Sequence, residues 1–286
     1  MKKHSAFSLI ELSIVILIIG ILVAGITQSS RLVKAMKLKT AQNLTKSSAV
    51  NSIKNLTIWY ETTVDESFAD SEEENNTDIS TWNDINPQSS SKSNATQSST
   101  KPQYIEGAMN GLPVVRFNGT DDFLNFDGTL LVNTNYTIFV VEQRRTGTGI
   151  NKHFLGGSGV ATNTNLHLGY RNDTTVTQDH YSNAINYTIP AYSSPIPRIH
   201  TFWFSNASGN GKKYWLNGGT TADAFDTSQT AYVASYAGSA IGRYASTSDY
   251  FNGDVAEIII FNRALNTEER QAVESYLSQK FNVKIS

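Results

Sequence analysis

Apolar residues are concentrated at the start of the chain. The stretch Phe7–Ile26 holds 20 residues and is interrupted by a single charge, Glu11. At about 1.5 Å per residue, a helix of this length spans about 30 Å, the thickness of the hydrocarbon layer of a membrane. Neither Pro nor Gly occurs between residues 27 and 58, where apolar residues recur at near-helical spacings. The pattern predicts one long α-helix over residues 7–55, with a transmembrane half and an amphipathic half. Two helices joined near residues 28–30 are the alternative.

The remainder of the chain has the pattern of an all-β domain. Short runs rich in β-branched and aromatic residues predict strands at Pro113–Phe117, Phe123–Phe126, Tyr136–Gln143, Asn165–Tyr170, His200–Ser205, Lys213–Leu216, Ala240–Tyr244 and Asp254–Phe261. The candidate turns between them are Asn118-Gly119, Asn217-Gly218-Gly219 and Asn252-Gly253. Many short strands without intervening helices favour a sandwich or jelly roll over a parallel sheet.

One further helix is predicted at the C-terminus. Asn266 and Glu269 have the spacing of a capping pair, and Val273, Leu277 and Phe281 then fall on one helical face.

Composition and charge exclude several classes of protein. The 286 residues include no cysteine, which excludes disulfide scaffolds, thiolate catalysis and cysteine-ligated metal sites. With 23 basic and 25 acidic residues the formal net charge is −2, and a nucleic-acid partner is not expected because phosphate binding needs a basic surplus.

The charge of Glu11 inside the apolar stretch is unusual, because an unpaired carboxylate at membrane depth costs a few kcal/mol. Glu11 either extends to the lipid headgroups or meets a cation within the membrane. A secretory signal cleaved near Ala24-Gly25 is an alternative for the whole segment. The basic residues after the stretch outnumber those before it, so charge counting alone would leave the following domain in the cytoplasm.

The string Ala6-Phe7-Ser8-Leu9-Ile10-Glu11-Leu12, after a short basic leader, resembles the prepilin signal of type IV pilins and type II secretion pseudopilins. The resemblance implies that a prepilin peptidase removes residues 1–6 by cutting between Ala6 and Phe7, and methylates the new amino group of Phe7. It also implies that Glu11 pairs with the N-terminal amine of a neighbouring pilin-like subunit. Such signals usually have Gly where this chain has Ala6.

The same resemblance implies a location that overrides the charge count. The precursor is expected to cross the bacterial inner membrane once, with its body in the periplasm, and then to enter a pilus or pseudopilus, which can reach the cell exterior. Removal of the leader changes the formal charge from −2 to −4, because Lys2 and Lys3 are lost.

Several segments of residues 56–286 form an ordered series, namely Trp82-Asn83-Asp84, Asn94–Gln97, Asn110–Gly119 and Tyr250–Ile258, followed by the terminal helix. In this order they resemble the concanavalin A-like (laminin G-type) jelly-roll domain of bacterial surface proteins. The Ser-rich stretch 88–101, which by composition alone reads as a linker, then becomes a loop inside the domain.

No catalytic residue is predicted. Asp254 and Glu257 differ by an odd number of residues, so on a regular strand they face opposite sides and cannot form the carboxylate pair of a glycoside hydrolase. Asn118, Asp121 and Asp122 are weak candidates for a calcium site because calcium prefers carboxylate and amide oxygens. Otherwise no metal or cofactor is expected.

Two functions remain open. The favoured one is a pilin-like subunit, minor or at the tip, that displays a domain binding surface glycans or proteins. The alternative is a membrane-tethered sugar-binding or carbohydrate-active surface protein outside any filament. Trp203 and Trp215 lie in apolar runs and are expected in the core, so the binding residues stay unknown.

Overall fold

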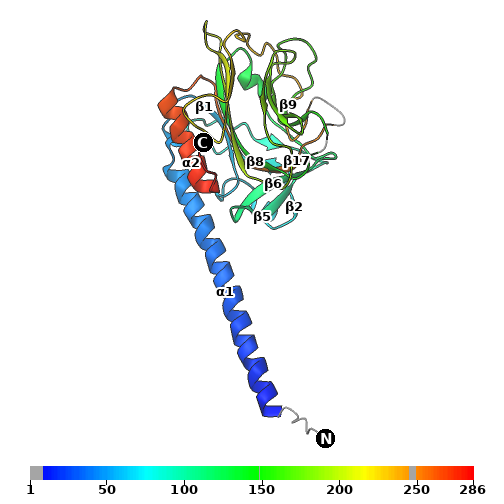
Figure 1. Cartoon of the computed structure of the whole chain (residues 1–286), viewed down its shortest axis with the longest axis vertical. Coiled ribbons are helices and arrows are strands. Elements are labelled where there is room, and N and C mark those ends of the chain that lie inside the picture. The colour runs from blue at the N-terminus through cyan, green and yellow to red at the C-terminus, as the bar shows by residue number, and fades with distance from the viewer. Residues whose placement is uncertain (1–8, 148, 245–248) are drawn as a thin grey trace.

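The computed structural model describes residues 9–147, 149–244 and 249–286, which form a β-sandwich with a helix at each end of the chain (Figure 1). Helix α1 spans Leu9–Ser47 and extends away from the sandwich, and helix α2 spans Thr267–Phe281. A 3-10 turn at Ala49–Asn51 follows α1. The helical segment therefore ends before residue 55, the end that the sequence predicts.

Two antiparallel sheets make up the sandwich. The larger sheet has the order β15-β14-β13-β8-β17-β6-β5-β2, with β1 also paired to β17, and the second sheet has the order β12-β11-β10-β9-β16-β7-β4-β3. The strand bounds are β1 Leu56–Glu61, β2 Thr77–Asp78, β3 Thr81–Trp82, β4 Ala95–Thr96, β5 Gln103–Met109, β6 Leu112–Asn118, β7 Leu124–Asn125, β8 Tyr136–Arg144, β9 Lys152–Gly156, β10 His167–Asn172, β11 Thr175–Asp179, β12 Ala184–Thr188, β13 Arg198–Ser205, β14 Gly211–Leu216, β15 Ala224–Asp226, β16 Ala240–Ile241 and β17 Asn252–Phe261.

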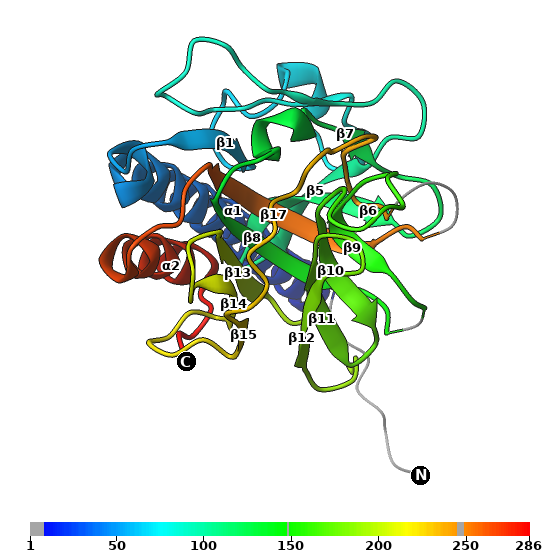
Figure 2. The same ribbon diagram turned by 90° about the horizontal axis from the view of Figure 1, so that it is seen from above.

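The central strand β8 is buried along its whole length because it separates two hydrophobic cores. Its residues Tyr136, Ile138 and Val140 face the core between the sheets. The alternate residues Phe139 and Val141 face a second core, which lies between the larger sheet and the two helices. Figure 2 shows both helices on this outer side of the larger sheet. Because both faces of β8 are buried, its sequence contains a continuous apolar run without alternation of polar residues.

The predicted C-terminal helix is confirmed. The Asn266 side chain accepts a hydrogen bond from the backbone N–H of Glu269, and the Glu269 side chain accepts one from the Asn266 backbone, which completes a capping box. Val273, Leu277 and Phe281 are buried in the second core.

Of the predicted turns, Asn252-Gly253 is wrong. Both residues lie in β17, opposite Asn118 and Phe117 of β6. A side chain at Gly253 would meet the Phe251 ring, so this glycine permits close packing and not a reversal of the chain.

Candidate functional site

The predicted cleavage and methylation residues, Ala6 and Phe7, lie outside the described residues. Glu11 lies in α1, but its side chain is also outside the description. From Leu12 to Val23 the large apolar side chains of α1 are exposed, at about half or more of their full surface. An apolar helix surface of this extent needs a partner, either lipid or other helices.

Across the ranges that the structure describes, no helix combines the length and the apolar character that crossing a membrane requires. The predicted transmembrane half of α1 therefore stays a prediction.

The other end of α1 is built into the domain. Ala41 and Thr45 are buried there, and Val50 and Ile53, which follow the helix, pack in the second core. This helix end lies beside α2 (Figure 1). Helix α1, which we call the stem, and the sandwich consequently share one core.

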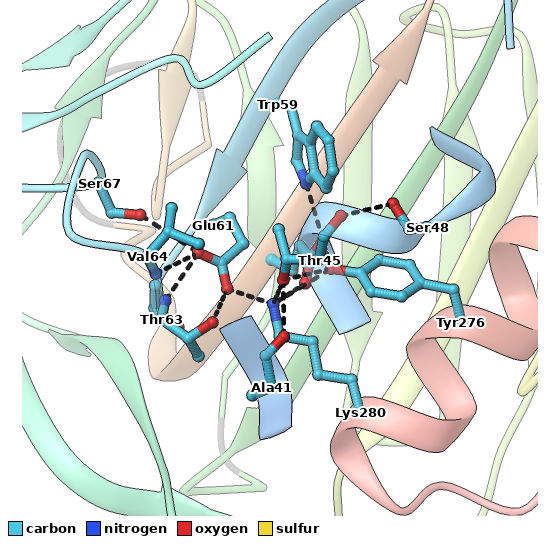
Figure 3. A network of polar contacts seen from close by, with 12 residues as sticks. Ala41, Thr45, Ser48, Trp59, Glu61, Thr63, Val64, Ser67, Tyr276 and Lys280 are labelled. Atoms are coloured by element: carbon cyan, nitrogen blue, oxygen red, sulfur yellow. Dashed lines mark hydrogen bonds and ion pairs between the residues drawn. The ribbon is translucent and has the colours of Figure 1, made fainter. Parts of the chain in front are cut away.

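A buried ammonium joins the stem to the sandwich (Figure 3). The Nζ of Lys280 in α2 donates hydrogen bonds to Glu61 of β1, to Oε2 of Glu257 in β17 at 2.9 Å and to Oγ1 of Thr45 in α1 at 2.9 Å. The Tyr276 hydroxyl lies 3.0 Å from that of Thr45 and donates to Oε1 of Glu257 at 2.8 Å. We call these five residues the lysine network; all are nearly or fully buried, and they connect four elements.

Further donors hold the two carboxylates of the network. The backbone N–H groups of Thr63 and Val64 donate to Oε2 of Glu61 at 2.7 and 2.9 Å. The indole N–H of Trp59 donates to Oε1 of Glu257 at 2.7 Å. Buried charges are tolerated when they are paired and hydrogen-bonded in this way.

The pKa values of the two carboxyl groups are shifted in opposite directions. Burial by itself raises the pKa of Glu61, but the charge of Lys280 and the hydrogen bonds from Lys280, Thr63 and Val64 outweigh it, so the net pKa is lowered. Burial raises the pKa of Glu257, although Lys280 opposes the shift, and the charge of Glu61 adds to it. Glu61 is therefore the anion that Lys280 stabilises most.

The expected opposition of Asp254 and Glu257 is wrong. The pairing of β17 with β8 shifts register between Val255 and Glu257, and this bulge turns both carboxylates to the outer face of the larger sheet. Asp254 forms a bidentate ion pair with Arg116, at 2.6 and 2.9 Å, while Glu257 belongs to the lysine network. Each carboxylate is thus occupied by its own cation.

The calcium candidates form a compact turn after β6. The Asn118 side-chain oxygen accepts the backbone N–H groups of Thr120 and Asp121, and its amide nitrogen donates to Oδ1 of Asp121 at 2.8 Å. Oδ2 of Asp122 accepts the backbone N–H of Asn118 at 2.9 Å. Burial raises the pKa of Asp122 to about 6. These bonds account for the turn itself, and among the described residues no cluster of three or more acidic or histidine side chains is placed to hold a metal.

Trp215 is buried, as expected, whereas Trp203 is only half-buried and belongs to neither hydrophobic core, contrary to expectation. They line a groove on the outer face of the larger sheet, where Trp203 is half-buried and Trp215 is buried. The apolar run that contains each of them does not reveal which face of the sheet is covered.

The sequence also gave no sign of two buried histidines on the second sheet. The rings of His153 and His167 stack with centroids 5.6 Å apart, beneath Tyr244. Both ring nitrogens of His153 are buried without a hydrogen-bond partner among the described residues. Burial lowers the pKa of both histidines. Both rings are therefore neutral at pH 7.

Comparison with known proteins separates the two ends of the chain. Residues 1–27 match the family model of the prokaryotic N-terminal methylation motif. The chain begins with a prepilin-type segment. The rest of the chain lies outside that match, and a search of the curated proteins found no similar protein.

Solved structures resemble the sandwich. The binding domain of Paraclostridial Mosquitocidal Protein 1 is 14% identical over 79% of this chain and 53% of its own, with a TM-score of 0.55. The Ruminococcus gnavus IT-sialidase CBM40 bound to alpha2,3 sialyllactose is 13% identical over 56% of this chain and 96% of its own, with a TM-score of 0.46. Trypanosoma rangeli sialidase in complex with sialic acid is 14% identical over 79% of this chain and 33% of its own, with a TM-score of 0.48. This chain thus spans about a third of that sialidase and half of the mosquitocidal protein's domain. At these identities the likeness concerns the fold.

Proposed function

We propose that the protein is a pilin-like subunit that displays a glycan- or protein-binding sandwich on a type IV pilus or a type II secretion pseudopilus. The observation that carries the proposal is the methylation motif over residues 1–27, which overlaps the first part of α1, where large apolar side chains are exposed. In this proposal the prepilin peptidase cuts after Ala6 and methylates Phe7, and the precursor is anchored in the inner membrane by the first half of α1.

Glu11 is the assembly residue in this proposal. A carboxylate surrounded by apolar helix surface is costly unless a cation comes within hydrogen-bond reach. The amine at Phe7 of a neighbouring subunit is such a cation, and it exists only after the leader has been removed. Cleavage and assembly would then be coupled through one ion pair.

A minor or tip position suits the size of the sandwich, which occupies most of the chain. A bulky head on every subunit would crowd the filament surface, whereas a head at the tip meets no neighbour in front of it. We propose binding and not catalysis for the head, since Asp254 and Glu257 are each engaged by a cation of the same chain.

The lysine network supports a load-carrying role for α1. It anchors the stem through Thr45 to both the first and the last strand of the head. A merely tethering helix needs no such connection, because a flexible linker would serve. The alternative, a surface protein tethered by α1 outside any filament, predicts that the stem is dispensable for everything except membrane attachment.

The test is Glu11→Ala in cells that make the filament, with Glu106→Ala, an exposed carboxylate on β5, as the matched control. Loss of the Glu11→Ala protein from sheared filaments, with normal incorporation of the control, supports assembly. Membrane display without a filament fraction for the wild type would sink the proposal in favour of the tethered alternative. Mass spectrometry of the mature N-terminus adds a second readout: N-methyl-Phe7 is expected, and an intact Met1 contradicts processing.

A further inference from the structure

Three aromatic residues, Trp203, Trp215 and Phe225, line a groove at one edge of the larger sheet. The strands that carry them, β13, β14 and β15, lie near α2 (Figure 2). Trp203 of β13 lies opposite Lys213 of β14, and Lys213 lies opposite Phe225 of the edge strand β15. Trp215 follows two residues after Lys213 and so faces the same side. At about 4.8 Å between strands, the row from Trp203 to Phe225 is about 10 Å wide, which is about the length of a disaccharide. We call this site the aromatic groove.

The two indole rings are held in fixed orientations. The indole N–H of Trp203 donates to the backbone oxygen of Leu265 at 2.9 Å, and the Lys213 ammonium lies 4.7 Å from the centre of the Trp203 ring. The Arg270 guanidinium lies 4.1 Å above the Trp215 ring. Since the rings are already ordered, a ligand that stacks on them loses little of its binding energy to side-chain ordering.

The orientation of the Arg270 side chain is itself fixed by hydrogen bonds to other parts of the chain. Its guanidinium donates to both carboxylate oxygens of Glu274 and to the backbone oxygen of Gly219 at 2.8 Å. The loop that contains Gly219 and the first turn of α2 therefore form stable walls of the groove.

The groove has room for a small ligand and is lined by both apolar and polar side chains. Its volume is about 560 Å³, within the range of small-ligand sites. The Phe225 ring is 64% exposed at the outer end of the groove. Hydroxyl-bearing and amide residues form the rim, namely Thr220, Thr227, Asn266 and Thr267. The buried indole N–H of Trp215 has no hydrogen-bond partner among the described residues.

We propose that the aromatic groove binds a short carbohydrate chain, whose sugar rings stack on Trp203 and Phe225 while their hydroxyls meet the polar rim. This inference rests on the proposed binding role of the head and names the site and ligand class. Flat apolar rings alternating with hydroxyl groups match the two faces of a sugar. A protein partner fits less well, because stable protein interfaces bury about 800 Å² on each partner and a local hollow supplies less.

The aromatic groove lies on the outer face of the larger sheet, on which the helices also pack, because Trp215 alternates along β14 with Tyr214 of the core between the sheets. A ligand bound there would contact the stem side of the head. The N-terminal end of α2, with Thr267 and Arg270, would also touch it.

The experiment uses the full chain, purified in detergent, on a glycan array, followed by titration with the strongest binding oligosaccharide. Trp59 and Trp82 are fully buried, so a change in tryptophan emission on titration reports on Trp203 and Trp215. Phe225→Ala is expected to weaken binding about five- to tenfold, the loss of one aromatic contact, and Phe225→Trp to retain it. Because Phe225 is exposed, neither variant should change the unfolding midpoint.

Val160→Ala is the matched control, since Val160 is exposed and lies outside the groove. It is expected to bind as the wild type does. Binding that is identical in Phe225→Ala and wild type, or absence of a tryptophan signal, overturns the groove and leaves the binding role intact. Absence of any glycan signal from the wild type overturns both the groove and glycan binding, while filament incorporation stays open to its own test.

Discussion

Replacing Lys280 by methionine removes the cation of the lysine network without changing the length of the side chain much. Glu61 and Glu257 then stay buried with no positive partner, since Lys280 is the ion-pair partner of both. Removing one member of a buried ion pair typically costs about 3–5 kcal/mol of unfolding free energy. We expect Lys280→Met to lose that amount at pH 7.

The pH dependence follows from how the carboxyls respond. Without Lys280, each can avoid a buried charge by taking up a proton, which from a usual pKa near 4.5 costs about 3 kcal/mol per group at pH 7 and under about 1 kcal/mol at pH 5. Raised pKa values in the folded variant mean stability that is present at low pH and lost as the pH rises. Because the pKa of Glu257 is already raised in the wild type, most of the difference comes from Glu61, and it should shrink to under about 1 kcal/mol at pH 5.

The wild type itself behaves in the opposite sense at Glu61. The lowered pKa of Glu61 contributes stability above its unfolded pKa, and that contribution is lost as the pH falls through the folded value. The two pH profiles should consequently converge from both sides on acidification.

The measurement is urea unfolding of the full chain in mild detergent between pH 5 and 8, followed by tryptophan fluorescence. Lys284→Met removes an exposed lysine four residues later and serves as the control, with no expected change. A loss below about 1 kcal/mol at pH 7, or a loss of equal size at all pH values, would refute the reasoning about buried charge.

Three further outcomes are expected. Because burial lowers the pKa of His153, acidification from pH 7 to 5 should cost the wild type up to about 2 kcal/mol for this group, and His153→Phe should lose less in the same urea titration. If the turn after β6 binds calcium, millimolar calcium should raise the melting temperature of the wild type and not of Asp122→Asn; no shift in the wild type contradicts the calcium prediction. A fragment that starts at Leu56 should be less stable than one that starts at residue 28, because burial of Val50 and Ile53 alone is worth about 3–6 kcal/mol; equal melting temperatures would show that the stem contributes nothing.

Features that depend on a few consecutive residues were predictable from the sequence. The apolar runs of β8, β13 and β17 and the Asn266 capping box were all found at or near their observed positions. In each case the signal is contained within a few consecutive residues, through periodicity or the spacing of a cap.

Strands with mixed composition were missed because no such signal is contained within a few of their consecutive residues. In β5 the apolar residues are interrupted by Glu106 and Gly107, and β11 has one apolar residue, Val176, so their pairing comes from neighbouring strands. The bulge in β17 is a property of its partners too, and it reversed the expected side of Glu257. Propensity is a weak guide when tertiary pairing decides the conformation.

The candidate sites depended on long-range contacts to an even greater degree. Lys280 and Glu61 are 219 residues apart, and nothing in either neighbourhood indicates the other. Trp203 and Trp215 were expected in the core because apolar surroundings indicate burial without indicating which layer provides it.

The order in which the chain can fold is limited by two long-range contacts. They are the pairing of β1 with β17 and the ion pair of Lys280 with Glu61. The strand that receives the stem is among the first parts of the head to be synthesised, and its partners are among the last. Contacts between such distant segments form slowly, since the loop between them must first be closed. The contacts of Lys280 with the stem and with Glu61 cannot form until translation has delivered residue 280, so a partly synthesised chain lacks the network that holds the stem to the head. A stem held by Lys280 therefore indicates that the chain has been completed through α2.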